Sequence, residues 1–303
     1  PPPPPKTLFP YTTLFRSVAE SWELSCHKDG PSVVADGEYK GLTLNEYIEK
    51  AGKGVLGKNF ERFENFPILI KLIDAKDNLS VQVHPDNDYA MRVEGEYGKT
   101  EMWYVVDCDE GATLLYGFKH EITKEEFARR IADNTLLEVT NAVPVKKGDV
   151  FFIKSGTLHA IGKGILIAEI QQNSNTTYRI YDYGRVGKDG KPRELHVNKA
   201  LDVTKLAPAE QYPETPVEKK DGYDIKLLSK CEYFTTYRVN VETKAELDAD
   251  ENSFNSILVL EGEPVISGGE TVSAKKGESV FISAGTGKYT VEGKCTFVLT
   301  KID

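Results

Sequence analysis

The sequence contains few cysteines, and none of them lies in a recognisable pairing motif. Cys26, Cys108, Cys231 and Cys295 are scattered over 303 residues without a Cys-x-x-Cys motif. A disulfide scaffold or a structural zinc cluster would require closely spaced cysteines, so neither is expected. Scattered cysteines are typical of a reducing compartment, and we therefore expect a cytoplasmic protein.

Long apolar runs and basic stripes are also lacking. No run approaches the roughly 20 apolar residues that a membrane-spanning helix needs, so no membrane partner is expected. The net charge is −9, and Lys and Arg form no stripe, which disfavours nucleic acid as a partner. The length and the 40% hydrophobic content instead indicate a globular protein of about two domains.

The first 17 residues have no acidic side chain and no amphipathic period. Five prolines precede Thr7–Ser17, which resembles, residue for residue, the translation of a widely used DNA sequencing adapter. The segment does not have the apolar stretch behind a basic start that a signal peptide has. We expect residues 1–17 to be a non-native, disordered leader, with native-like sequence beginning near Val18.

Short apolar runs separated by Gly, Asp, Asn and Pro make up most of the chain after Phe66. This spacing is typical of an all-β sandwich or barrel. The clearest strand candidates are Ile68–Ile73, Met102–Val106, Val150–Ile153, Ile165–Ile170, Ile257–Leu260 and Ser279–Ile282. The sequence therefore predicts a mainly β fold.

Two capping boxes predict short helices within this pattern. Thr43-x-x-Glu46 begins a helix through Ile48, and Thr123-x-x-Glu126 begins another through about Asp133. The second helix is expected to be an insertion between two strands. Prolines among charges predict a linker or crossover at residues 203–222.

An internal repeat is visible in the β pattern. Residues 146–159 (KKGDVFFIKSGTLH) align with residues 275–288 (KKGESVFISAGTGK). The alignment places His159 opposite Lys288, and no histidine follows His196. We interpret the repeat as two copies of one β unit, of which only the first carries metal-type residues.

Polar residues at strand spacing interrupt the apolar pattern of the first copy. Gln82 and His84 alternate with valines, Lys99 and Glu101 precede an apolar strand, and His159 lies in Gly-Thr-Leu-His. Alternate residues of a strand share a face, so these polar groups are expected on one wall of the β structure. Burying them is costly unless a ligand binds them, and two histidines with one carboxylate are the ligand set of a catalytic zinc site.

Longer motifs carry a resemblance to a known family. Leu79–Asp86 followed by Gly98–Tyr104, and Gly156–Ala160 followed by Glu169–Asn173 and Tyr178–Arg185, resemble class I mannose-6-phosphate isomerases in their short bacterial form. These enzymes belong to the cupin superfamily of jelly-roll barrels. The resemblance implies a catalytic metal-binding cupin domain at residues 18–205, with a helical insertion at about 120–140. It implies a linker and a second, metal-free cupin-like domain at residues 206–303.

The resemblance also implies roles for individual residues. One zinc ion would be held by His84, Glu101 and His159, with Gln82 as the fourth ligand. Arg179 would be the active-site arginine, Lys99 would lie close to the substrate, and Glu169 would transfer the proton. Ser80, Lys71 and Arg185 would bind the phosphate of the substrate.

The implied reaction interconverts mannose 6-phosphate and fructose 6-phosphate through an enediolate, which needs an electrophile and one acid–base group. Two alternatives stay open at this point. One is another metal-dependent cupin enzyme such as an iron oxygenase, because two histidines and a carboxylate also hold non-haem iron. The basic residues Lys99, Arg179 and Arg185 argue against an apolar substrate. The other is a non-catalytic sugar-phosphate-binding cupin, against which the intact set of candidate ligands argues.

Overall fold

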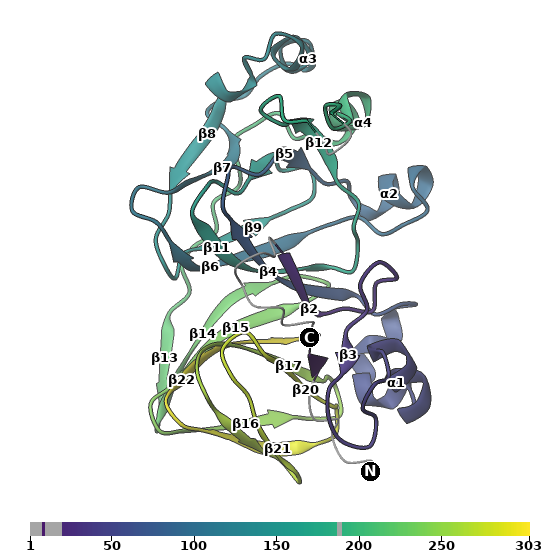
Figure 1. Ribbon diagram of the computed structural model, residues 1–303, viewed down its shortest axis with the longest axis vertical. Coiled ribbons are helices and arrows are strands. Elements are labelled where there is room, and N and C mark those ends of the chain that lie inside the picture. The colour runs from purple at the N-terminus through teal and green to yellow at the C-terminus, as the bar shows by residue number, and fades with distance from the viewer. Residues whose placement is uncertain (1–7, 10–19, 187–189) are drawn as a thin grey trace. The chain divides into compact units, whose positions relative to one another are not determined.

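The computed structural model of the chain describes residues 8–9, 20–186 and 190–303, and it divides into two compact units (Figure 1). Unit 1 comprises Pro1–Leu72 and Pro213–Asp303, and unit 2 comprises Ile73–Tyr212. The domain boundaries expected near residues 17 and 205 stay a prediction, because compact units need not coincide with domains.

The predicted leader lies outside the described residues except for Leu8–Phe9. These two residues form β1, which pairs antiparallel with β3 (Val33–Val34) and with β20 (Ser279–Ile282). That residues 1–17 are a non-native, disordered leader stays a prediction.

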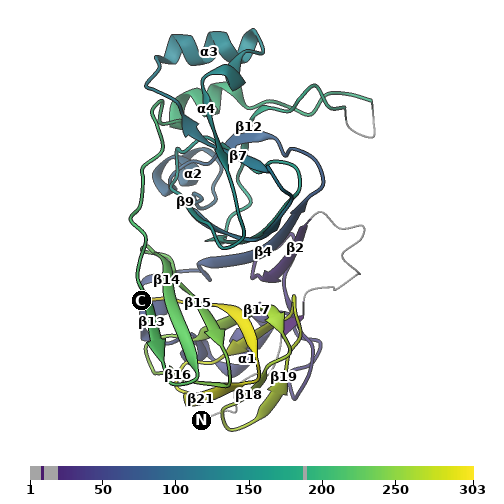
Figure 2. The same cartoon turned by 90° about the vertical axis from the view of Figure 1, so that its left-hand side faces the viewer.

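Unit 2 is built from two β-sheets that curl around a core, as Figure 2 shows. The first sheet has the order β12 (Tyr178–Tyr181), β5 (Val81–Val83), β10 (His159–Ala160), β7 (Thr113–Phe118) and β8 (Thr140–Pro144). In the second sheet, β6 (Glu101–Cys108) lies between β11 (Ile165–Gln172) and β9 (Val150–Ile153), and β11 lies beside β4 (Ile68–Ala75). The chain passes from unit 1 into unit 2 within β4.

Alternation along the strands decides which side chains enter the core of unit 2. On β6, Trp103 and Val105 are fully buried in a cluster with Ile165 and Ile167 of β11. On β5, Val81 and Val83 pack into a different apolar cluster, while Gln82 points to the opposite face of the strand. The polar residues of the first sheet are thereby directed away from this second cluster.

Four α-helices are found in the described residues, and two of them begin at the predicted capping boxes. Thr43 caps α1 (Leu44–Ala51), and Thr123 caps α3 (Lys124–Ala132), which together with the 3₁₀ helix η3 (Leu136–Glu138) forms the predicted insertion. The sequence did not predict α2 (Asn87–Val93) or α4 (Val197–Val203), each only seven residues long. α4 packs against β12 and α3 packs against α4, and apolar residues of both helices belong to one buried cluster with Val81 and Val83 of β5 (Figure 1).

Unit 1 contains the second β structure. Its larger sheet has the order β13 (Val217–Lys220), β14 (Tyr223–Lys230), β15 (Thr235–Val241), β22 (Cys295–Lys301), β17 (Asn255–Gly262), β20, β1 and β3. Its smaller sheet has the order β16 (Lys244–Ala249), β21 (Gly287–Glu292), β18 (Val265–Ser267) and β19 (Thr271–Ser273). Unit 1 also contains β2 (Glu20–Leu24) and the 3₁₀ helices η1 (Lys53–Leu56) and η2 (Lys58–Arg62). The two sheets enclose a core that includes Val239, Ile257 and Phe297, so the predicted mainly β fold with two β units is confirmed.

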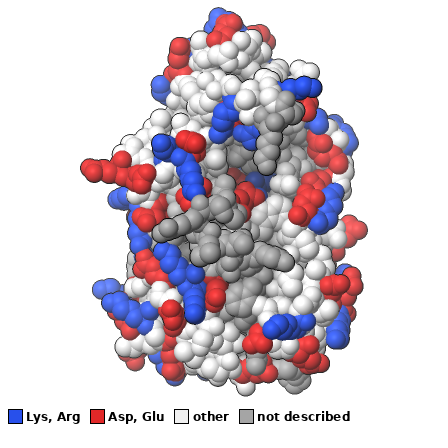
Figure 3. Space-filling view, viewed as in Figure 1, with Lys and Arg blue, Asp and Glu red and all other residues white. Residues whose placement is uncertain are grey.

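The surface carries charges of both signs. On the face in Figure 3, basic and acidic side chains are mixed over the visible atoms. Within the described part of the chain, no helix has the length and apolarity needed to cross a bilayer.

Candidate metal centre

Three strands of unit 2 bring together three of the four predicted metal ligands. His84 follows β5 directly, Glu101 begins β6, and His159 begins β10. β10 pairs with β5 so that His159 lies opposite Gln82. The ligands are thus held at strand ends, where the two sheets meet around the core.

The three side chains form a compact, buried cluster. The Nε2 atoms of His84 and His159 are 3.1 Å apart. Glu101 Oε2 lies 3.6 Å from His84 Nε2, and Glu101 Oε1 lies 3.5 Å from His159 Nε2. His84 is 1% exposed and the other two residues are 0% exposed, so water does not screen this group.

Backbone carbonyl groups determine the orientation of both imidazoles. His84 Nδ1 donates to Thr176 O at 3.0 Å, and His159 Nδ1 donates to Thr157 O at 2.8 Å. A carbonyl oxygen can only accept, so each Nδ1 carries a proton and each Nε2 of a neutral ring has a lone pair. Burial lowers the pKa of His159 to about 4, which makes that ring neutral near pH 7.

These donor atoms fit a metal ion. Nitrogen lone pairs and carboxylate oxygens converge in a space where they repel one another unless a cation or proton lies between them. A tetrahedron with bonds of about 2.0–2.1 Å has edges of about 3.3 Å, which is close to the measured separations of 3.1, 3.5 and 3.6 Å. In addition, neither carboxylate oxygen of Glu101 accepts a hydrogen bond of good geometry within the described residues.

Two further ionisable residues lie beside the cluster. Lys99 Nζ is 2.9 Å from Glu101 Oε2 and 3.7 Å from Glu169 Oε1. Trp103 Nε1 donates to Glu169 Oε2 at 2.8 Å. In their ordinary charge states, the two carboxylates and one ammonium group sum to −1, a buried charge that a divalent cation would offset.

A row of side chains across the first sheet leads from His159 to Arg179. In the β-sheet register, Gln82 is paired with His159 on one side and with Arg179 on the other. Directly paired residues share a face, and neighbouring strands are about 4.8 Å apart, which places Arg179 about 10 Å from His159 along this row. Burial, followed by the charge of Arg193, lowers the pKa of Arg179, and its buried Nε has no hydrogen-bond partner among the described atoms.

The three predicted phosphate residues occupy different surroundings. Ser80 is buried immediately before β5, while Arg185 donates from Nε to Asp182 Oδ1 at 3.1 Å and from Nη1 to Asn78 O at 2.8 Å. Lys71 belongs to unit 1, where its Nζ lies 3.3 Å from Glu20 Oε1 and 4.8 Å from the centre of a Trp22 ring. The structure therefore places Ser80 and Arg185 in the same unit as the cluster.

Some residues of this neighbourhood were not predicted from the sequence. Trp103 lies two residues after Glu101 and so shares its face, a signal that alternation alone could have provided. Arg193 binds Asp182 alongside Arg185, but it lies in a polar loop without periodicity. Only the tertiary structure brings these two arginines to one carboxylate.

Family models match both β structures of the chain. Residues 10–111 match the model described as phosphomannose isomerase type I, catalytic domain, and residues 224–302 match mannose-6-phosphate isomerase, cupin domain. Mannose-6-phosphate isomerase ManA of Bacillus subtilis is 39% identical over 296 residues, which cover 97% of this chain and 92% of the relative. The chain belongs to the type I phosphomannose isomerase family.

Other members of the phosphomannose isomerase family agree in sequence and fold. Mannose-6-phosphate isomerase of Streptococcus mutans is 39% identical over 277 residues, covering 90% of this chain and 85% of the relative. The crystal structure of the mannose 6-phosphate isomerase from Bacillus subtilis superimposes with a TM-score of 0.90 at 36% identity, covering 98% of this chain and 99% of that one. The resemblance deduced from motifs and the expected cupin fold are both confirmed.

Proposed function

We propose that this chain interconverts mannose 6-phosphate and fructose 6-phosphate, using a zinc ion held by His84, Glu101 and His159. The observation that carries the proposal is the convergence of these three buried donors beside a second buried carboxylate, that of Glu169. An aldose–ketose isomerase needs both an electrophile and an acid–base group at one place.

Zinc is the metal we favour because two histidines and one carboxylate form a catalytic zinc set with an open position. When bound, zinc acts as a Lewis acid that stabilises negative charge developing on substrate oxygens. Gln82 shares the face of His159 and is proposed as the fourth ligand. The carbonyl groups of Thr176 and Thr157 hold the imidazoles in the tautomer that a metal requires.

Glu169 is the proposed acid–base group. Trp103 holds one carboxylate oxygen by a hydrogen bond, and the ammonium group of Lys99 lies near the other. This arrangement restricts the rotation of the carboxylate, so that it can remove a proton from one carbon and return it to the neighbouring carbon. A positioned carboxylate of this kind accelerates proton transfer by about 10²–10⁴-fold.

The basic residues are proposed to bind the charged parts of the substrate. Arg179, at the end of the row through Gln82, would stabilise the oxygens of the enediolate by its planar guanidinium fork. Lys99 would lie near the reacting carbons, and Ser80, Lys71 and Arg185 would bind the phosphate. The lysines and arginines of this set suit an anionic sugar and have no role with an apolar substrate.

We further propose that the enzyme is cytoplasmic and acts on this small molecule without nucleic acid or membrane. All four cysteines are free thiols, which is compatible with a reducing compartment. The proposed domain division stays as expected from the family, with catalysis in residues 18–205 and a second domain without metal in 206–303.

A coupled assay of mannose 6-phosphate conversion tests the function and the metal together. We expect no activity after removal of metal by a chelator and recovery with one equivalent of zinc. Recovery with ferrous iron alone, together with oxygen consumption, would favour the oxygenase alternative. Zinc and sugar-phosphate binding without turnover would favour the non-catalytic alternative.

A further inference from the structure

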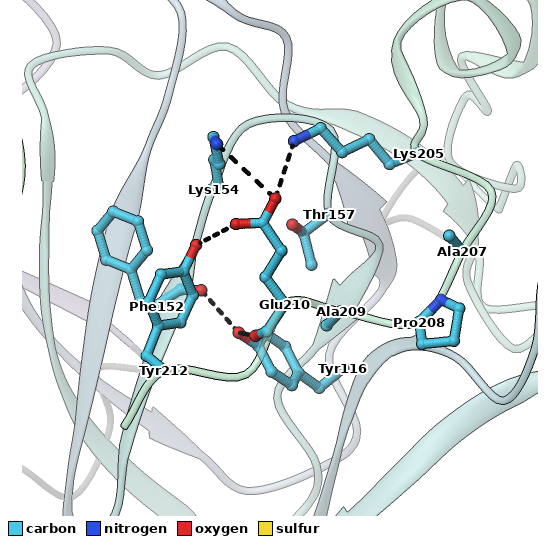
Figure 4. A pocket seen from close by; sticks show the side chains of 10 residues that line it. All are labelled: Tyr116, Phe152, Lys154, Thr157, Lys205, Ala207, Pro208, Ala209, Glu210 and Tyr212. Carbon is cyan, nitrogen blue, oxygen red and sulfur yellow. Dashed lines mark hydrogen bonds and ion pairs between the residues drawn. The ribbon is translucent and has the colours of Figure 1, made fainter. Parts of the chain in front are cut away.

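A hollow of about 200 Å³ opens in unit 2 and is distinct from the metal centre. Its volume is several times the roughly 30 Å³ that one water takes in the liquid. Aromatic rings and small apolar residues form its walls, and two lysines reach it from separate segments (Figure 4). Its lining includes Thr157, Lys154, Lys205, Glu210 and Tyr212.

A carboxylate of the chain itself occupies this hollow. Glu210 Oε1 lies 3.7 Å from Lys154 Nζ and 3.8 Å from Lys205 Nζ, and Tyr212 donates to Glu210 Oε2 at 2.7 Å (Figure 4). The lysine contacts are longer than charge-assisted hydrogen bonds, which measure about 2.7–2.9 Å. Lys154, Lys205 and Glu210 are each 50% or more exposed, so the carboxylate can leave without disrupting a core.

The backbone beneath the hollow holds the metal ligands. Thr157, whose side chain lines the hollow, accepts from His159 Nδ1 through its carbonyl oxygen at 2.8 Å. Gly156 N donates to His84 O at 2.8 Å, and Gly156 O accepts from Lys205 N at 2.8 Å. One turn, residues 154–157, therefore includes Lys154 and contacts Lys205 and both histidines.

This turn has little room to adjust. Gly156 has φ +85°, and a Cβ at this position would lie 2.8 Å from Val203 O. The turn is therefore closely packed against the segment that carries Lys205, to which Gly156 O is also hydrogen-bonded.

We propose that this hollow is a binding site for a small anion bearing a carboxylate or phosphate group, for which Glu210 is an internal competitor. The bound anion takes the place of the Glu210 carboxylate between Lys154 and Lys205. Binding then alters the turn that holds His84 and His159 and changes how firmly the metal is retained. This last effect rests on the proposed metal site, whereas anion binding itself does not.

Calorimetric titration of the full-length enzyme with succinate and, separately, with inorganic phosphate tests the site. In the wild type the Glu210 carboxylate blocks the site in most molecules, and this weakens the apparent affinity for an anion in proportion to the fraction of molecules left open. Glu210→Gln should therefore tighten anion binding about five- to tenfold. The double variant Lys154→Met/Lys205→Met should lose the succinate heat. Because phosphate can also occupy the substrate site, only the phosphate heat that this double variant removes counts for the hollow. Binding of succinate alone would identify a carboxylate ligand, and binding of both would identify a general oxyanion site.

A matched control uses another exposed ion pair of the chain. Lys58 and Glu251 lie 2.7 Å apart in unit 1, and Glu251→Gln should leave both titrations unchanged. If Glu210→Gln binds anions no more tightly than the wild type and only lowers the melting temperature, Glu210 merely attaches its segment to the barrel and the proposal is wrong.

The coupling between anion binding in the hollow and retention of the metal is measured separately, as the rate at which a chelator removes the metal. With Glu210→Gln, saturating succinate should change this rate about fivefold or more, the lower end of usual allosteric couplings. The Lys154→Met/Lys205→Met variant should show no succinate effect. Equal rates with and without succinate in Glu210→Gln would overturn the coupling, even if the assay of mannose 6-phosphate conversion succeeds.

Discussion

The two copies of the internal repeat fold into the same turn and strand. In the first turn, Lys146 N donates to Asp149 Oδ2 at 2.9 Å, and in the second, Lys275 N donates to Glu278 Oε2 at 2.8 Å. Each turn contains a glycine with positive φ, Gly148 at +92° and Gly277 at +85°. The strands that follow, β9 and β20, pair with β6 and β17 in equivalent ways.

The copies differ at the last residue of the repeat. His159 is fully buried and faces Glu101, whereas Lys288 is exposed on β21. The shared turn is therefore a feature of the fold and does not depend on a metal. The candidate metal ligands are a few side chains at strand ends of one copy, in keeping with the general separation of fold and function.

The largest expected difference between the copies comes from exchanging these two residues for alanine. His159→Ala should lose bound metal and lower kcat at least about 10⁴-fold, since a metal supplies several kcal/mol of charge stabilisation. Lys288→Ala should keep wild-type metal content and turnover. Metal analysis and the coupled assay check both, and an inactive Lys288→Ala enzyme would place the active site in the other copy.

Glu169→Gln separates proton transfer from metal binding within the first copy. The amide keeps the size of the side chain and can still accept from Trp103, but it cannot take up a proton. We expect kcat to fall about 10³-fold with unchanged metal content. Exchange of the substrate C2 proton with solvent should fall in parallel, and unchanged exchange would assign the base to another residue.

Arg179→Lys tests whether the row across the first sheet contributes to the transition state. The charge is kept but the planar fork is lost, so kcat should fall about 10²-fold, comparable to the loss of one oxyanion donor. Metal content should stay the same and KM should change little. A normal kcat would remove Arg179 from the active site.

The surroundings of buried carboxyl groups also differ between the two units. Glu101 has the ammonium group of Lys99 at 2.9 Å, whereas burial raises the pKa of Glu23 in unit 1 from 4.5 to about 7, opposed by a Ser21 hydrogen bond. Because the folded-state pKa is raised, the stabilising contribution of protonated Glu23 is complete below pH 4.5 and is lost as the pH rises to about 7.

Urea denaturation between pH 4.5 and 7 should therefore show a fall in unfolding free energy of at most about 3 kcal/mol from this group. Glu23→Gln, which is neutral at every pH, should remove that part of the slope. The exposed control Glu251→Gln should keep it. An unchanged slope in Glu23→Gln would mean that Glu23 is ionised in the folded protein.

The smallest expected effect distinguishes the turns that follow β9 and β20. Gly285 has φ +78° with open space around a Cβ, so Gly285→Ala should cost only about 1–2 kcal/mol of left-handed strain. Gly156→Ala adds a clash with Val203 O and should cost about 1–3 kcal/mol more. Thermal unfolding of both variants checks this order, and equal losses would show that the first turn is looser than its contacts indicate.

Local patterns were sufficient for most of the fold. β9 and β20 have the predicted limits, and α1 and α3 begin at their capping boxes, because alternation and capping depend on neighbours in the sequence. The short helices α2 and α4 were missed because two turns of helix carry little periodic signal. Their formation depends on packing against the barrel.

The sequence by itself determined the β pattern, the repeat and the candidate ligands, since each depends on residue types at short spacings. Only the tertiary structure decided that His84, Glu101 and His159 meet within 4.8 Å, that Asp182 binds two arginines, and that Glu210 lies between two lysines. The metal ligands, and Lys154 and Glu210, lie far apart in the chain, and a local pattern does not specify which distant segments will meet. Arg185 and Arg193 are near Asp182 in sequence, but their loop has no periodic pattern from which the contacts could be predicted.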